Sequence, residues 1–112
     1  MNLITINVYI YTFFIKSESW RKPFIDDQYH LVHEQHHFDI SRLGAQEFYN
    51  SLLHNNFSAS NYKQRLKDIF NKTYSDNLAL QDQYDKETEH SIKNAEQLKW
   101  NENISNAVSK LN

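Results

Sequence analysis

The sequence predicts an α+β domain in which an amino-terminal β-strand is followed by two long helices and a short terminal helix. Apolar and polar side chains alternate between residues 4 and 14, which is the period of a strand. Further along, apolar residues recur at helical spacing in two long segments and one short one. The chain has 112 residues, enough for one small domain.

The strand is expected at residues 3–15, "LITINVYIYTFFI". Ile4, Ile6, Val8 and Ile10 lie on one face, and β-branched and aromatic residues dominate the segment. A lone strand leaves its backbone donors and acceptors unpaired, and no later segment has the character of a strand. We therefore expect the chain to be the carboxy-terminal part of a longer domain, with strand-mediated self-association as the alternative.

The first long helix is expected from about Tyr29 to Leu53, with Asp26 or Asp27 capping its start. The segment "HNNFSASN" then breaks the helical pattern. A second helix is expected from about Ser60 to Glu87. The short terminal helix carries the apolar residues Leu98, Ile104, Val108 and Leu111.

Composition excludes several classes of function. Net charge is −2, with acidic and basic residues mixed, so we expect no nucleic-acid or anionic-membrane partner. The absence of cysteine excludes disulfides, thiolate zinc sites and cysteine nucleophiles. The amino-terminal segment has no basic residue before its apolar run and no small-residue cleavage pattern. It therefore indicates neither a signal peptide nor a membrane span.

The pentapeptide "HEQHH", residues 33–37, is the feature that points to chemistry. On a helix, His33 and His37 lie one turn apart on one face, where two neutral imidazoles can bind one zinc ion. Glu34 lies beside them, where its carboxylate can take a proton from a zinc-activated water. The alternative is a solvated helix face that is rich in histidine and binds nothing. His30 and His36 are either part of a secondary metal site or simply exposed.

Gly44 is the only glycine in the chain, and it falls in the middle of the same predicted helix. Glycine there costs about 1 kcal/mol relative to alanine. Gly44 lies on the face that carries His33 and His37. Two explanations remain open: another element approaches closely over this face, or the glycine is a tolerated kink.

A catalytic zinc site needs a third protein ligand and an open position. The candidates outside the cluster are His90, Glu87, Glu89 and His54.

The two segments "LVHEQHHFDISRLGAQEF" and "YDKETEHS" resemble a bacterial family known as domain of unknown function 922, described as predicted secreted zinc-dependent proteases. The family pairs an H-E-Q-x-H-F-D-type helix with a downstream Y-D-x-x-T-x-H-G-type segment. "SESW" ahead of the helix also resembles the family's strand-to-helix junction. The matching positions are His33, Glu34, Gln35, His37, Phe38, Asp39, Tyr84, Asp85, Thr88 and His90.

The resemblance implies one zincin-like, metal-binding domain over residues 1–112 and an extracytoplasmic location, periplasmic or secreted. It favours His90 as the third zinc ligand over Glu87. Tyr84 would stabilise oxyanion charge, the alternative being an aromatic of the core. Asp85 would orient a ligand imidazole or be a surface carboxylate. Ser91 departs from the family's glycine, and the family's signal peptide and further amino-terminal strands are not visible here.

These observations favour a zinc-dependent metallopeptidase whose substrate is a peptide or protein. In this hypothesis His33, His37 and His90 hold Zn²⁺, and Glu34 is the general base. The first alternative is a non-catalytic zinc-binding module that lacks a substrate cleft. The second is a helical interaction domain whose histidines bind nothing.

Overall fold

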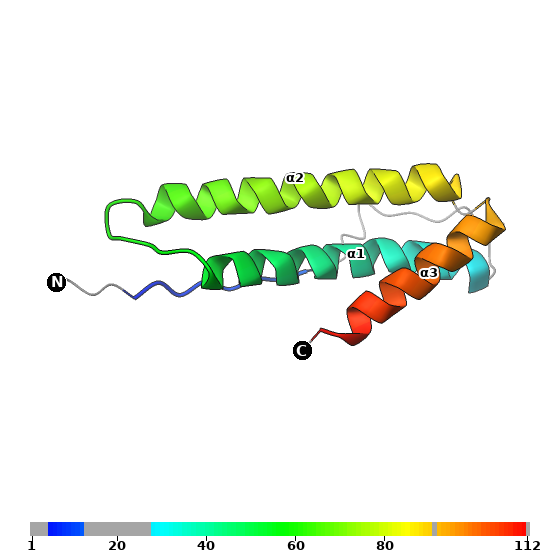
Figure 1. Cartoon of the computed structure of the whole chain (residues 1–112), viewed down its shortest axis with the longest axis horizontal. Helices are drawn as coiled ribbons and strands as arrows, with labels where there is room; N and C mark the ends of the chain where they lie inside the picture. The colour runs from blue at the N-terminus through cyan, green and yellow to red at the C-terminus, as the bar shows by residue number, and fades with distance from the viewer. Residues whose placement is uncertain (1–4, 13–27, 91, 112) are drawn as a thin grey trace.

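The computed structural model describes residues 5–12, 28–90 and 92–111, and these form three helices. They are α1 (Gln28–Leu53), α2 (Tyr62–Thr88) and α3 (Asn94–Ser109). The long helices α1 and α2 lie side by side and antiparallel, and α3 crosses them near the end of α2 (Figure 1). The helices predicted from the spacing of apolar residues are therefore confirmed, with boundaries within a few residues of those expected.

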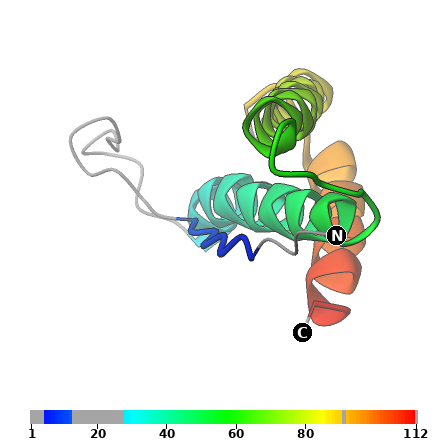
Figure 2. The same ribbon diagram turned by 90° about the vertical axis from the view of Figure 1, so that its left-hand side faces the viewer.

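The predicted α+β, zincin-like fold class is wrong, because the described residues contain no strand. Residues 5–12 have no regular secondary structure, and the rest of the predicted strand lies outside the described residues. Val8, Ile10 and Thr12 instead line a hollow together with residues of α1, among them Phe38. The segment runs beside α1 (Figures 1 and 2).

The physical reason for this error is that alternation describes only which side chains share a face. A strand also needs backbone hydrogen bonds to a neighbouring strand, and the described part of the chain supplies none. A helix surface can accept the alternate apolar side chains equally well. The expected self-association stays a prediction.

The turn between α1 and α2 is closed by Ser58 and Asn61. The backbone N–H of Ser58 donates to Asn61 Oδ1 at 2.8 Å, and the backbone N–H of Asn61 donates to Ser58 Oγ at 3.2 Å. This reciprocal pair satisfies backbone donors where a helix begins, as a capping box does. It ends the connection and starts α2 at Tyr62.

Each helix contributes one buried hydrophobic residue to the core: Ile40, Tyr84 and Ile104. Leu80 and Trp100 are among the half-buried side chains that pack against them. The described residues bury more polar side chains than hydrophobic ones. The buried polar residues are His33, His36, Asp39, Thr73, Thr88 and Gln97. Burial of polar groups is costly unless they are hydrogen-bonded. This excess therefore indicates that buried polar side chains have a role besides packing.

Gly44 allows α2 to approach α1 closely, so the first explanation of this glycine is confirmed. A Cβ atom at this position would lie 2.6 Å from Nδ2 of Asn77. That amide donates to the backbone carbonyl of Ile40 at 2.8 Å. The glycine therefore makes room for a side-chain-to-backbone bond that fixes α2 against α1.

Among the described residues, no helix is both long and apolar enough to cross a bilayer.

Candidate metal centre

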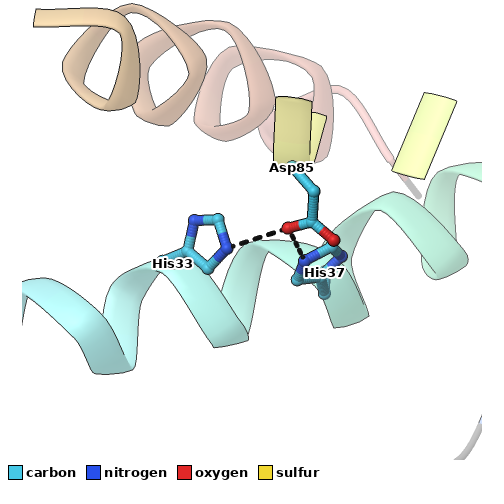
Figure 3. A group of neighbouring side chains, drawn as sticks. All are labelled: His33, His37 and Asp85. Atoms are coloured by element: carbon cyan, nitrogen blue, oxygen red, sulfur yellow. Dashed lines mark hydrogen bonds and ion pairs between the residues drawn. The ribbon is translucent and has the colours of Figure 1, made fainter. Parts of the chain in front are cut away.

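Two histidines of α1 and one aspartate of α2 meet between the helices (Figure 3). His33 and His37 are one helical turn apart, which places both imidazoles on the face that α2 covers. Oδ1 of Asp85 lies 3.2 Å from Nε2 of His33 and 2.7 Å from Nε2 of His37. The three ligand atoms all lie within 4.8 Å of one another.

The centre is closed on one side and open on the other. The side chain of His33 is only 2% exposed, whereas those of His37 and Asp85 are 25% and 28% exposed. Structural zinc sites are normally closed, while catalytic ones keep a position for water or substrate. The partial exposure leaves solvent access to the carboxylate.

The Nδ1 atoms of both histidines face amide oxygens. Nδ1 of His33 donates to Oε1 of Gln97 on α3, and Nδ1 of His37 donates to Oε1 of Gln81 on α2, each at 2.6 Å. An amide oxygen only accepts hydrogen bonds, so each Nδ1 carries the proton. In a neutral ring, Nε2 then has a free lone pair directed toward Asp85.

This donor set fits a divalent metal ion. Two neutral imidazole nitrogens and a carboxylate are a common combination of zinc ligands. Ligands held at 2.0–2.1 Å in a tetrahedron lie about 3.3–3.4 Å apart. The 3.2 Å between His33 and Asp85 is close to this value, and the 2.7 Å between His37 and Asp85 is shorter. Lone pairs that converge in this way repel one another unless a cation or a proton lies between them.

Tyr84 is fully buried, and its ring stacks on His33 with 4.5 Å between the ring centroids. Its hydroxyl donates to the backbone carbonyl of His33 at 2.9 Å and accepts a hydrogen bond from Nε2 of Gln97 at 2.7 Å. This placement is that of a core aromatic that supports His33. The predicted role of Tyr84 in stabilising an oxyanion stays a prediction.

His90 lies at the edge of the centre. Its Nδ1 is 3.5 Å from the same Asp85 oxygen, although its side chain is 79% exposed. The backbone of His90 has a φ of 53°, and its N–H donates to the carbonyl of Asp85 at 3.0 Å. This left-handed turn at the end of α2 brings the imidazole back toward the carboxylate. Its predicted role as third ligand stays a prediction, and Asp85 is the third member that the geometry supplies.

The other candidate ligands are engaged elsewhere. The two carboxylate oxygens of Glu87 accept hydrogen bonds from Gln83 and Trp100. Glu89 pairs with Lys93. His54 lies beyond the far end of α1 and bonds a backbone carbonyl there.

His36 is buried rather than exposed, and its Nδ1 lies 3.0 Å from Asp39 Oδ2. His30 is in α1, but its side chain lies outside the described part of the chain. Glu34 is exposed on α1 immediately after His33. Its predicted role as general base stays a prediction.

Sequence reasoning missed Gln81 and Gln97, and it gave Asp85 only a supporting role. A signal was available on α2. Asn77, Gln81, Tyr84, Asp85 and Thr88 recur at intervals of three or four residues, which places them on one helix face. A polar stripe along the face that also carries a buried tyrosine indicates a buried network. Gln97, on another helix, had no comparable signal.

The fold and the site together define a small helical protein with a candidate metal centre between antiparallel helices. Residues 19–91 match the family described as bacterial protein of unknown function (DUF922), and the chain belongs to this family. No curated protein and no solved structure matches the chain.

Proposed function

We propose that the protein binds one zinc ion through His33, His37 and Asp85 and uses it to hydrolyse peptide bonds outside the cytoplasm. The observation that carries the metal proposal is the convergence of two imidazole nitrogens on one carboxylate oxygen, at 3.2 and 2.7 Å. His90, whose Nδ1 lies 3.5 Å from that oxygen, would add a fourth ligand. Hydrolysis and the extracytoplasmic location rest on the resemblance in sequence.

Each residue then has a distinct task. When bound, zinc supplies a Lewis acid that polarises a substrate carbonyl and the attacking water. His33 and His37 contribute neutral nitrogen ligands, and Asp85 balances the positive charge. Glu34 accepts the proton of the attacking water and passes it to the leaving amine. The exposed side of the centre, at His37 and Asp85, is where a peptide would enter.

A non-catalytic zinc-binding module is the second candidate function. The observation that favours it is the absence of a strand in the described residues. An edge strand is a common means of holding a peptide backbone in extended form, and three helices do not offer one. The two functions share the metal centre and differ in the role of Glu34.

Zinc content tests the metal centre. Elemental analysis of the purified protein should give one zinc per chain for the wild type and much less for Asp85→Asn and His37→Ala. Asp85→Asn keeps the shape of the side chain while removing its charge. His54→Asn is the matched control, because His54 bonds only the local backbone at the far end of α1 in the contacts described. Equal zinc in Asp85→Asn and the wild type would remove Asp85 from the site.

Hydrolysis separates the two functions. If Glu34 is the general base, Glu34→Gln should keep its zinc while cleavage of a broad peptide library falls by a factor of roughly 10²–10⁴. Glu47→Gln, an exposed glutamate on the same helix, should cleave as the wild type does. A wild-type protein that holds stoichiometric zinc and cleaves no peptide favours the binding module.

A further inference from the structure

The two glutamines that contact the histidines of the centre are themselves held in one orientation. Nε2 of Gln81 donates to the backbone carbonyl of His37 at 3.0 Å. A carbonyl cannot donate, so the amide nitrogen of Gln81 must point toward it. The amide oxygen of Gln81 is thereby turned toward Nδ1 of the same histidine, 2.6 Å away.

Gln97 is oriented by the same logic through one more group. The hydroxyl of Tyr84 gives its only proton to the backbone carbonyl of His33, so toward Gln97 it can only accept. Nε2 of Gln97 therefore points to Tyr84, at 2.7 Å, and Oε1 points to Nδ1 of His33, at 2.6 Å. Gln97 is fully buried, which gives its amide no water with which to exchange these partners.

Each of these two chains of hydrogen bonds begins and ends on its own histidine. The backbone carbonyl of His37 fixes the polarity of Gln81, and Gln81 fixes the proton on the His37 ring. The carbonyl of His33 does the same through Tyr84 and Gln97. Because carbonyl groups of a helix have one direction, each Nδ1 faces a fixed acceptor before any ion binds, in competition with the Asp85 carboxylate that lies at both Nε2 atoms.

We propose that Gln81 and Gln97 are positioning residues that hold His33 and His37 as the Nδ1–H tautomer, with both Nε2 lone pairs facing Asp85. This inference deepens the proposed zinc centre and rests on it for its purpose. It also gives α3 a role in the centre, because Gln97 lies on α3. This residue is outside residues 19–91, the part of the chain that matches the family. Removal of either amide leaves its ring free to adopt the other tautomer, whose Nε2 carries a proton and cannot bind a metal.

Side-chain nitrogen NMR tests the tautomers directly, in the metal-free protein and after addition of Zn²⁺ alone. At a pH at which the rings are neutral, Nδ1 of His33 and of His37 should carry the proton in both states. Gln81→Met, which removes the acceptor at similar size, should abolish this preference at His37 and preserve it at His33. Zinc affinity should fall by roughly 10–100-fold, as is usual for loss of an outer partner of a metal ligand.

Two further variants make the test specific. Gln83→Met is the matched control, because Gln83 is exposed on α2 and bonds Glu87, and it should change neither the tautomers nor the zinc affinity. Gln97→Glu retains an oxygen acceptor for His33, so the Nδ1–H form should persist there, whereas Gln97→Met should lose it. If Gln97→Met does not fold, the wild-type spectrum and Gln81→Met still decide.

Protonated Nε2 atoms in the wild type, or unchanged tautomers in Gln81→Met, would overturn the inference whatever the protein binds. The expected tautomers without zinc binding would refute the proposed function and leave the positioning role intact. Zinc binding with the reverse tautomers would refute the positioning role alone.

Discussion

One carboxylate oxygen organises the candidate centre. Oδ1 of Asp85 lies within 3.5 Å of nitrogen atoms from His33, His37 and His90. A single carboxylate acceptor among three imidazoles is a favourable position for a metal ion. Its position one residue after the buried Tyr84 sets where the carboxylate points, because α2 turns by a fixed angle per residue.

His90 offers a test in which stability and metal binding should change in opposite directions. Its φ of 53° is a left-handed conformation that a side chain disfavours and glycine adopts freely. His90→Gly should therefore stabilise the metal-free protein by about 0.5–1 kcal/mol. If the imidazole ligates, the same change should lower zinc affinity at least about tenfold.

Urea denaturation and competitive zinc titration measure these two effects. His90→Asn serves as the control, since asparagine tolerates the left-handed region and lacks the imidazole. It should show the loss of affinity with little change in stability. Undiminished zinc affinity in both variants would limit the centre to His33, His37 and Asp85.

At the scale of elements, the pairing of α1 with α2 depends on the contact between Gly44 and Asn77. The amide of Asn77 bonds the carbonyl of Ile40 at 2.8 Å, and its Oδ1 accepts a weaker bond from Gln81 at 3.3 Å. The contact thus fixes how far α2 is shifted along α1. That register is what brings Gln81 and Asp85 level with the two histidines.

Gly44→Ala should destabilise the protein by about 1–2 kcal/mol. The new Cβ would meet Asn77 at 2.6 Å, and the cost of crowding and of the lost hydrogen bond exceeds the gain of about 1 kcal/mol in helix propensity. In an Asn77→Ala background, where the crowding is absent, the same change should stabilise by about 1 kcal/mol.

Urea denaturation of the four members of this double-mutant cycle gives the coupling between the two positions. Stabilisation by Gly44→Ala in both backgrounds would show that the glycine is not required by the contact with Asn77.

At the scale of the whole molecule, the core is small for the length of the helices. The described part buries three hydrophobic side chains in one cluster, and the molecule extends over 61 × 29 × 23 Å. A small core leaves a small net stability. The polar centre between the three helices therefore contributes strongly to the stability of the fold. A bound ion would increase that stability.

Zinc should raise the melting temperature markedly. An ion that binds only the folded state adds about 2.7 kcal/mol at a hundred times its Kd, which corresponds to an increase on the order of 10 °C for a domain of this size. Thermal melts with excess Zn²⁺ and with a chelator measure the difference. Asp85→Asn should lose most of it, and His54→Asn should keep it. Equal melting temperatures with zinc and with chelator would contradict the proposed centre.

The sequence by itself determined the three helices and the pairing of His33 with His37, because both follow from local spacing along one helix. For Gly44 the same local logic left a close approach and a tolerated kink equally open, and the contact with Asn77 decided between them. This logic failed for the amino-terminal segment, where alternation of side chains could not reveal whether a partner strand exists.

The tertiary structure alone decided which groups surround the two histidines. Asp85 reaches them across the interface between α1 and α2, and Gln97 comes from α3, 64 residues further along the chain than His33. No spacing rule links residues on different helices, since their separation depends on the register and crossing of those helices. The direction in which a buried amide points is likewise fixed by its partners in space, and these partners decided which ring nitrogens face Asp85.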